Sequence, residues 1–282
     1  MSSPFAYDGP GSMSLDRTAA NHNERAWDSL AKQGQRFTKA AKDEEFQDPL
    51  KILDGNNWLG GSIEGKKLLC LAAGGGRQGP LYAAAGAEVT VVDISASQLE
   101  LDRVVAQERQ IRIKTVKTSM DDLSMFSVGE FDIVIHPVAT CYLPNIENVF
   151  QHVARVTRIG GLYINQHKQP TSLQTDVKPL GQAYPIVEPY YRSEPLKDVV
   201  GSLHREEGTM EFLHRWEQII GGQCRAGFVI EDLVEPFHGD ANARPGTFAH
   251  RSHFAAPYVR IKARRSGGHD HFEQKSSVWL PD

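Results

Sequence analysis

The stretch LLCLAAGGGRQGP, residues 68–80, decides the fold of this 282-residue chain. It begins as an apolar run of strand length, passes through three consecutive glycines and continues with Gly79 and Pro80. Proline favours the first turn of a helix, because its missing N–H has no partner there. Glycines adopt positive φ without steric cost and let the backbone approach a ligand closely. The stretch therefore predicts a buried strand, a ligand-binding loop and a helix, in that order.

The second informative residue is Asp93, which ends the apolar run VTVV thirteen residues after Pro80. In an open parallel sheet, ligands bind at the C-terminal ends of adjacent strands, and an acidic residue there suits the two hydroxyls of a ribose. A glycine loop together with this aspartate predicts a cofactor that contains an adenine nucleoside. The alternative interpretation is a tight turn beside a surface aspartate.

Short apolar runs alternate with helical patterns over most of the chain. The runs LLCLA, VTVV and FDIVI have the continuous apolar character of strands that are buried on both faces. Strands and helices that alternate at these lengths indicate βαβ units and a parallel sheet covered on both faces. We therefore predict a doubly wound α/β domain, with strands over residues 67–72, 88–92, 111–117, 131–135, 161–165, 228–235 and 254–262 and helices over 80–85, 97–107, 145–156 and 209–223.

The two ends and one internal segment depart from this rhythm. Residues 1–20 are rich in Ser, Gly and Pro and predict a disordered tail, and residues 266–282 predict a second, flexible tail. Residues 21–265 form the predicted single domain, in which the helical pattern over 21–60 forms a cap. Residues 167–205 contain five prolines and predict an insertion that lies over the active site.

The composition is that of a soluble globular protein, with 40% hydrophobic and 23% charged residues and a net charge of −4. This balance carries no electrostatic signature of nucleic-acid or membrane binding. No apolar run reaches the roughly 18–20 residues that span a bilayer, and the N-terminal residues lack the features of a signal peptide. Cys70, Cys141 and Cys224 are widely spaced and predict reduced thiols. We therefore expect a cytoplasmic protein, and we consider a homodimer as its assembly.

Residues 74–79 match the dinucleotide pattern G-x-G-x-x-G, which keeps an NAD(P)-dependent Rossmann oxidoreductase open as an alternative. The sequence that follows favours another family. FDIVI at 131–135, then HPVATCYLPN, then RVTRIGGLYIN at 155–165 resemble the fourth strand and the helix–turn–strand of class I S-adenosylmethionine-dependent methyltransferases. The resemblance implies a Rossmann-like seven-stranded sheet, mostly parallel with an antiparallel last strand. It also implies S-adenosyl-L-methionine as the cofactor and S-adenosyl-L-homocysteine as the product.

The same resemblance assigns residues to the cofactor. In this family the glycine loop follows the methionine moiety, the end of the second strand holds the ribose, and residues after the third strand flank the adenine. The cofactor-binding residues implied in this way are Ala72, Ala73, Gly74, Gly75, Gly76, Asp93, Ile94, Gln98, Met120, Asp121 (with Asp122 as its alternative) and His136. Two positions depart from the family: Cys70 stands where an acidic residue is usual near the end of strand one, and Ser119 stands where aspartate is common.

The family's chemistry also limits what the protein itself must supply. The sulfonium of the cofactor already activates the methyl group. The protein has to align an acceptor atom with that methyl group, exclude water and, for an O–H or N–H acceptor, provide a base. Their positions after the predicted strands make His136, Tyr142 and His167 the candidate catalytic residues, since histidine titrates near neutral pH. The plainer interpretation is that most of the 11 histidines are hydrogen-bonded structural residues.

We therefore predict a methyltransferase that acts on a small-molecule acceptor by in-line displacement. A non-catalytic S-adenosylmethionine-binding protein is a further alternative, because of the departures at Cys70 and Ser119. The histidines match no metal-ligand spacing such as H-E-x-x-H, so we predict no metal site.

Aromatic residues outside these motifs have two interpretations each. Trp27 and Phe37 either cover the cofactor or pack in the core. Tyr184, Tyr190 and Tyr191 either line the acceptor pocket or anchor the insertion to the body.

Overall fold

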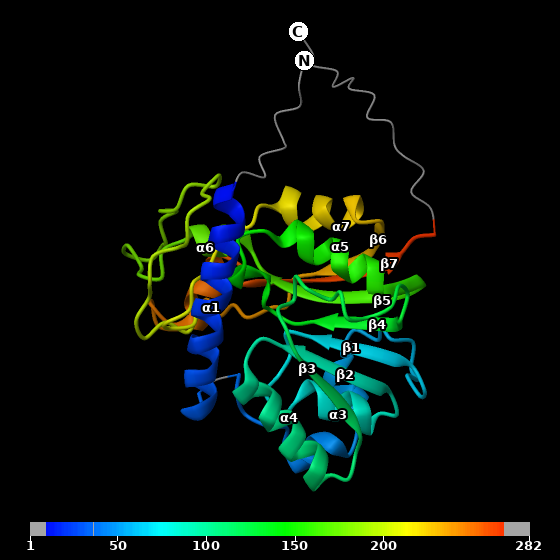
Figure 1. The fold of residues 1–282 in the computed structure, drawn as a ribbon. Helices are drawn as coiled ribbons and strands as arrows, with labels where there is room; N and C mark the ends of the chain where they lie inside the picture. Colours follow the sequence, from blue (N-terminus) through cyan, green and yellow to red (C-terminus); the bar gives the residue numbers. More distant parts are fainter. Residues whose placement is uncertain (1–9, 36, 268–282) are drawn as a thin grey trace, which may run out of the picture.

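The computed structural model describes residues 10–35 and 37–267, and a seven-stranded sheet forms its centre (Figure 1). The strands are β1 (Lys67–Leu71), β2 (Glu88–Asp93), β3 (Ile113–Lys117), β4 (Phe131–His136), β5 (Thr157–Lys168), β6 (Phe228–Val234) and β7 (Tyr258–Arg265). They pair in the order β3-β2-β1-β4-β5-β7-β6, and β7 runs antiparallel to both of its neighbours. The predicted doubly wound sheet with an antiparallel last strand is therefore confirmed.

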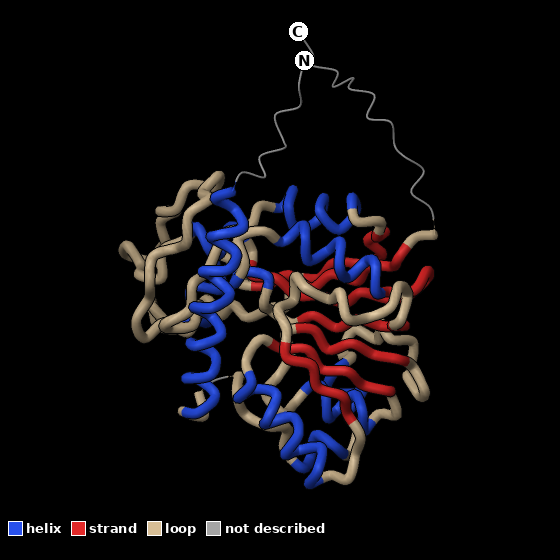
Figure 2. Tube along the Cα trace, viewed as in Figure 1, coloured by secondary structure: helices blue, strands red, loops and turns tan. Residues whose placement is uncertain are grey.

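Helices cover both faces of the sheet, as Figure 2 shows. One face carries α3 (Gln78–Ala84) and α4 (Ala96–Glu108). The other carries α5 (Ile146–Val156), the π-helix η3 (Glu217–Gly221) and α7 (Gly222–Arg225). Successive residues of a strand point to opposite faces. Alternate residues of β1 accordingly pack in two separate cores, Leu68 and Cys70 in the one that contains Tyr82 and Leu99, and Leu69 and Leu71 in the one that contains Val149.

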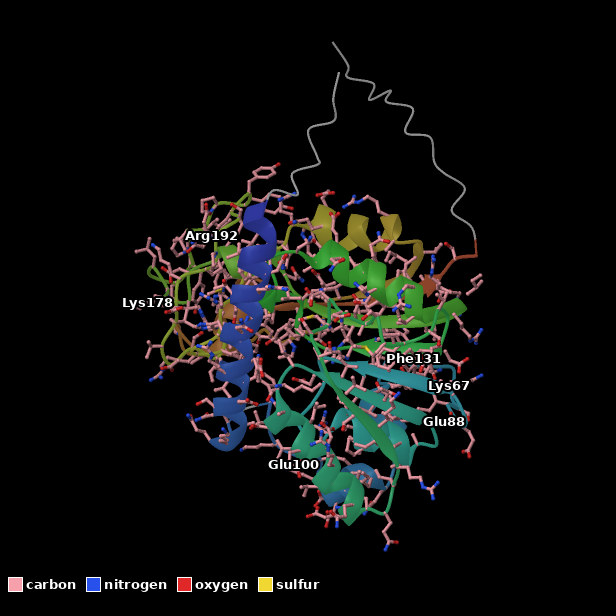
Figure 3. The ribbon with its side chains drawn as sticks, viewed as in Figure 1. Lys67, Glu88, Glu100, Phe131, Lys178 and Arg192 are labelled. Atoms are coloured by element: carbon pink, nitrogen blue, oxygen red, sulfur yellow. The ribbon has the colours of Figure 1, made fainter. Side chains whose placement is uncertain are left out.

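A long N-terminal helix, α1 (Pro10–Lys32), lies beside the ends at which the parallel strands finish. In Figure 3 the first residues of β1, β2 and β4 are labelled on the side of the sheet that lies away from α1. The Asp28 carboxylate accepts hydrogen bonds from the Ser95 hydroxyl and the Ser97 amide, just after β2. Lys117, the last residue of β3, forms an ion pair with Glu24 at 2.6 Å.

The N-terminal segment differs from its prediction in two ways. Residues 10–20 belong to α1 rather than to a disordered tail, because the helix gains partners on the body through its later turns; residues 1–9 lie outside the described part of the chain. The helical pattern over 21–60 is not one continuous cap. It breaks at Gly34, whose φ is +61°, and continues as the 3₁₀ helix η1 (Asp43–Phe46) and as α2 (Pro49–Leu53), which packs near α3.

The region after β5 is mostly irregular and contains α6 (Pro170–Gln174) and α8 (Phe248–Phe254). The predicted helix over 209–223 is wrong in its first half, since helical turns begin only at Trp216. The preceding backbone pairs elsewhere: the Phe212 amide donates to the Cys141 carbonyl at 2.7 Å. The last strand begins at Tyr258 rather than at Phe254, which ends α8. Of the predicted tail over 266–282, residues 268–282 lie outside the described part.

Candidate active site

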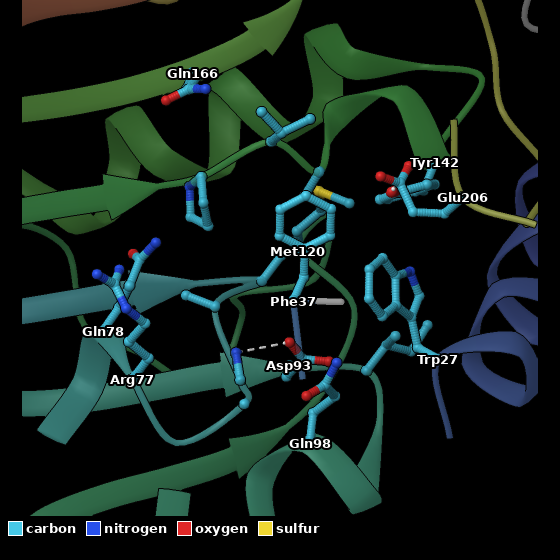
Figure 4. Close-up of a pocket in the computed structure, with 18 of the residues that line it drawn as sticks. Trp27, Phe37, Arg77, Gln78, Asp93, Gln98, Met120, Tyr142, Gln166 and Glu206 are labelled. Carbon is cyan, nitrogen blue, oxygen red and sulfur yellow. Dashed lines mark hydrogen bonds between the residues drawn. The ribbon is translucent and has the colours of Figure 1, made fainter. Parts of the chain in front are cut away.

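A cavity of about 810 Å³ opens at the C-terminal ends of β1, β2, β4 and β5, beneath α1 (Figure 4). Its walls come from α1, from the segment after it, from the loops after the parallel strands, from η2 (Thr140–Tyr142) and from the region after β5. The lining includes Trp27, Phe37, Ala72, Gly74, Asp93, Gln98, Met120, Tyr142, Gln166, Glu206, Phe248 and Arg260. Most of the wall thus follows the rule that ligands of an open α/β sheet bind beyond the carboxyl ends of its strands.

The glycine loop after β1 is tightly packed against the residues after β2. A Cβ on Gly74 would lie 2.7 Å from the Gln98 Cβ and 3.0 Å from Asp93 Oδ2. Gly75 has a φ of +122°, which side-chain-bearing residues rarely adopt. Ala72 also has a positive φ, of +49°, at the point where the chain leaves the strand. The loop therefore needs glycine at Gly74 and Gly75 in order to pass so close to the cavity.

Asp93 holds this loop and faces the cavity at the end of β2. Its Oδ2 accepts from the Gly74 amide at 2.9 Å, and its Oδ1 accepts from the Ser95 amide at 2.9 Å. Burial raises the pKa of Asp93 to about 6, although these amides favour the ionised form. Gln98, on the first turn of α4, lines the same wall, and its Oε1 is buried without a hydrogen-bond partner in the described structure. Asp93 and Gln98 thus place a carboxylate and a side-chain amide in the wall at this end.

The opposite end of the cavity carries a buried ion-pair network. Glu206 Oε2 accepts from the Tyr142 hydroxyl at 2.8 Å and from Lys168 Nζ at 2.6 Å. Lys168 Nζ also donates to Glu211 Oε1 at 2.9 Å, and Arg205 donates to the other oxygen of Glu211. The Lys168 and Glu211 side chains are almost fully buried, whereas Tyr142 and Glu206 reach the cavity (Figure 4).

The charges of this network stabilise one another. Burial alone would raise the pKa of Glu206, but Lys168 and the Tyr142 hydroxyl hold that pKa below its ordinary value. Burial alone would lower the pKa of Lys168, but Glu211 and Glu206 raise it. Burial and the Glu206 carboxylate raise the pKa of the Tyr142 hydroxyl well above its usual range. At neutral pH the cavity therefore faces an ionised Glu206 and a protonated Tyr142.

The helix α1 connects the two ends of the cavity. Asn23 donates to the Tyr142 carbonyl at 2.9 Å and accepts from the Met210 amide at 2.8 Å. Trp27, one turn later, meets the Tyr142 ring edge-on at a centroid distance of 5.5 Å. In Figure 4 Trp27 lies between the Asp93–Gln98 end and the Tyr142–Glu206 end. Trp27 and Phe37 both line the cavity. The geometry therefore favours the interpretation that these two residues cover the bound ligand over the interpretation that they only pack in the core.

The structure places most of the predicted cofactor residues in this wall. Those that line the cavity are Ala72, Ala73, Gly74, Gly75, Asp93, Ile94, Gln98 and Met120. Gly76 packs instead behind the loop, where a Cβ would lie 3.0 Å from the Leu101 carbonyl oxygen. Asp121 and Asp122 do not line the cavity; its wall next to Met120 is formed by Thr118 and Ser119. The Asp122 carboxylate bonds Ser124, so a reversal of the chain directs these acids away from the cavity.

Of the three candidate catalytic residues, only Tyr142 lines the cavity. His136 bonds the Tyr163 hydroxyl through Nδ1 at 2.8 Å, and burial lowers its pKa to about 3. It borders a separate cavity of about 140 Å³. His167 bonds Thr140 and Asn165, and burial lowers its pKa well below its usual value. The placement of both histidines at the active site is therefore wrong: the strand ends direct them into the interior.

The insertion also differs from its prediction. None of the described residues 167–205 lines the cavity, whereas the flanking Gln166 and Glu206 do. The tyrosines of the insertion act as anchors: the Tyr184 hydroxyl bonds His250, and the Tyr190 hydroxyl accepts from the Trp216 amide. Residues that the sequence did not assign to the site, such as Asn23, Glu206 and Phe248, line the cavity instead. The local sequence does not indicate which of the glutamates Glu206, Glu207 and Glu211 faces the cavity.

Known proteins of similar sequence decide the family. A family described as a methyltransferase domain matches residues 69–165. Over 229 residues the chain is 37% identical to a Bacillus subtilis (strain 168) protein named uncharacterized methyltransferase YbaJ. The aligned region covers 76% of this chain and 89% of that protein. The chain belongs to the class I S-adenosylmethionine-dependent methyltransferases. The predicted cofactor, S-adenosyl-L-methionine, is thereby confirmed, and the NAD(P)-dependent alternative is wrong.

Solved structures show the same methyltransferase fold. An S-adenosylmethionine-dependent methyltransferase from Mesorhizobium loti superposes with a TM-score of 0.61 at 19% identity, over 78% of this chain and 100% of that one. The 1,6-didemethyltoxoflavin-N1-methyltransferase of Burkholderia thailandensis gives 0.55 at 14% identity, over 94% and 93%. Within the described residues of this methyltransferase, no helix is both long and apolar enough to cross a membrane, and no three His, Cys, Asp or Glu side chains gather as metal ligands.

The residues of the site fit the methyltransferase cofactor. The Asp93 carboxylate and the side-chain amide of Gln98 would form hydrogen bonds with the ribose hydroxyls. Ile94 and Met120 would supply apolar surface beside the adenine, and the backbone of Ala72–Gly75 would lie along the methionine moiety. A Cβ at Gly74 would collide with Gln98 and Asp93, which explains why a residue without a side chain stands there.

Proposed function

We propose that this methyltransferase transfers the methyl group to a small-molecule acceptor that binds at the Tyr142–Glu206 end of the cavity, by direct in-line displacement. The observation that carries the proposal is that one cavity joins the glycine loop to Glu206. Its volume of about 810 Å³ lies within the roughly 300–1,000 Å³ of small-molecule pockets. A site of this kind holds an acceptor beside the cofactor and excludes water from both.

The network at Glu206 supports an acceptor that offers a hydrogen-bond donor. Glu206 is held by Tyr142 and Lys168, both through Oε2. Its carboxylate is ionised at neutral pH, because Lys168 compensates its burial. Such a group favours a hydroxyl or amine donor on the acceptor and orients it. Orientation is the main task of the protein here, since the methyl donor, when bound, supplies a methyl group that is already activated.

The aromatic residues of the acceptor-side wall support a planar or apolar body for this acceptor. Trp27, Tyr142 and Phe248 line the same cavity as Glu206, and flat rings stack well on such side chains. The structural neighbour from Burkholderia thailandensis was solved with bound 1,6-didemethyltoxoflavin and S-adenosylhomocysteine. A small molecule beside the cofactor product is thus compatible with this fold, which supports the same arrangement here.

The test is a turnover screen in which formation of S-adenosylhomocysteine is measured with panels of small hydroxyl and amine compounds. With the acceptor found in this way, Glu206→Gln should lower kcat/KM at least about tenfold, which matches loss of a charged hydrogen bond. Binding of S-adenosylhomocysteine should stay unchanged. The matched control is Glu207→Gln, because Glu207 is exposed and does not line the cavity.

Two outcomes would contradict the proposal. An equal loss of kcat/KM in both variants would mean that Glu206 does not contact the acceptor. Binding of the cofactor without turnover on any small molecule would favour the non-catalytic alternative.

A further inference from the structure

The glycine loop of this methyltransferase lacks the acidic residue that its family usually has near the end of strand one. Cys70 occupies that position and is fully buried. Burial, and the nearby Asp102 carboxylate, raise the pKa of the Cys70 thiol well above its usual value. A neutral thiol is a weak hydrogen-bond acceptor. Strand β1 therefore offers the loop amides no carboxylate.

A carboxylate reaches the loop from a different element. Asp102, on the second turn of α4, is fully buried, and its Oδ2 accepts a hydrogen bond from the Gly75 amide at 3.0 Å. Gly75 belongs to the part of the loop that lines the cavity. The first turn of α3 also packs closely against this aspartate, since a Cβ on Gly79 would lie 3.3 Å from Asp102 Oδ1.

The surroundings of Asp102 indicate that a burial without function would destabilise the fold. Oδ1 has no hydrogen-bond partner in the described structure, and burial of such an atom costs free energy. The titratable and charged groups nearby are Cys70 on β1, Asp93 on β2 and Arg103 on α4. Burial and the Asp93 charge raise the pKa of Asp102 to about 7, although the Gly75 and Gly76 amides favour the ionised form.

We propose that Asp102 is a positioning residue that replaces the missing strand-one carboxylate and holds the Gly75 amide in the orientation that cofactor binding requires. It acts through the backbone of the loop, because its own side chain does not line the cavity. The inference rests on assigning this loop to the cofactor and is independent of the acceptor. It is specific to a chain that carries Cys70 together with Asp102.

The experiment is calorimetric titration of the full chain with S-adenosylhomocysteine, alongside thermal unfolding. Asp102→Leu should weaken binding at least about tenfold, as expected for loss of a hydrogen bond to a charged group. Its unfolding temperature should not fall in proportion, because leucine suits a buried site. The control, Glu108→Gln on the exposed end of α4, should leave binding unchanged. Returning the acid to strand one, in Cys70→Asp/Asp102→Leu, should restore binding to within about threefold of the unchanged protein.

The pH profile of binding gives a second measurement, and its first part uses only the unchanged protein. Binding by the unchanged protein should strengthen as pH rises through about 7, since the ionised carboxylate is the better acceptor. Asp93 should contribute a separate step near pH 6, which Asp102→Leu retains while it loses the upper step. Tenfold weaker binding with rescue by Cys70→Asp supports the proposal. Unchanged affinity in a folded Asp102→Leu variant, or a profile without the upper step, overturns it.

The same titration distinguishes this inference from the proposed function. If the unchanged protein does not bind S-adenosylhomocysteine, both the loop assignment and the role of Asp102 are wrong. If it binds with the expected dependence on Asp102 but no small molecule is methylated, only the acceptor proposal fails.

Discussion

The two ends of the cavity are assembled from the chain in opposite ways. At the cofactor end, the Gly74 amide and the Asp93 carboxylate that it contacts are 19 residues apart. At the Tyr142–Glu206 end, which we call the acceptor end after the proposal above, Tyr142 and Glu206 are 64 residues apart, and Asn23 bonds the Tyr142 carbonyl across 119 residues. The first end is held by backbone amides on one βαβ unit, and the second by buried side-chain charges from separate elements. Local motifs therefore describe the cofactor end, whereas only packing creates the acceptor end.

The largest expected effect comes from breaking the acceptor-end network. Lys168→Met would leave the buried carboxylates of Glu206 and Glu211 without their shared cation. We expect the free energy of unfolding to fall by roughly 3–5 kcal/mol, the usual cost of removing one partner of a buried ion pair. Urea denaturation of this variant and of Lys178→Met, at an exposed lysine, measures the difference. A loss below about 1 kcal/mol would mean that the network is weakly coupled to the fold.

A smaller effect is expected at the cofactor end, where a substitution should weaken the binding of S-adenosylhomocysteine. Asp93→Ala removes the carboxylate that faces the cavity and bonds the Gly74 amide. The affinity for S-adenosylhomocysteine should weaken by about 1–3 kcal/mol, as calorimetry would show. Asp121→Ala is the matched control, because the sequence assigned Asp121 to the adenine while the structure places it outside the cavity. Equal losses in both variants would restore the sequence assignment.

The smallest effect is expected at Trp27, between the two ends. Trp27→Phe keeps an aromatic ring but reduces its contact area with the Tyr142 ring. An aromatic pair of this kind contributes about 0.5–1.5 kcal/mol. We expect a few-fold loss of S-adenosylhomocysteine affinity. We also expect ligand binding to change the tryptophan fluorescence of the unchanged protein, and this change to be lost in Trp27→Phe. Trp216→Phe, which packs against the core away from the cavity, should retain that change. A fluorescence change that survives in Trp27→Phe would show that α1 does not cover the cofactor.

The errors of the sequence-based prediction follow the same division. Gly74, Asp93 and Gln98 line the cavity as expected, because loop and strand end are adjacent in one βαβ unit. His136 was expected beside them, but it lies at the end of a strand where the side chain points into the interior toward Tyr163. A shift of one position along a strand reverses the face that a side chain occupies. Strand ends can be predicted to within a residue or two, which is too coarse to place a single histidine.

The sequence by itself determined the doubly wound sheet, the glycine loop, Asp93 and the methyl donor that this family uses. The sheet, the loop and the position of Asp93 depend on periodicity and on backbone requirements that act over a few residues, whereas the methyl donor follows from the resemblance of the later motifs to a known family. Only the tertiary structure decided that Glu206 faces the cavity while Glu211 and Lys168 lie behind it, and that Asp102 supplies a carboxylate where β1 carries Cys70. Such choices depend on which charges share a buried, low-dielectric space, and that follows from packing between distant segments.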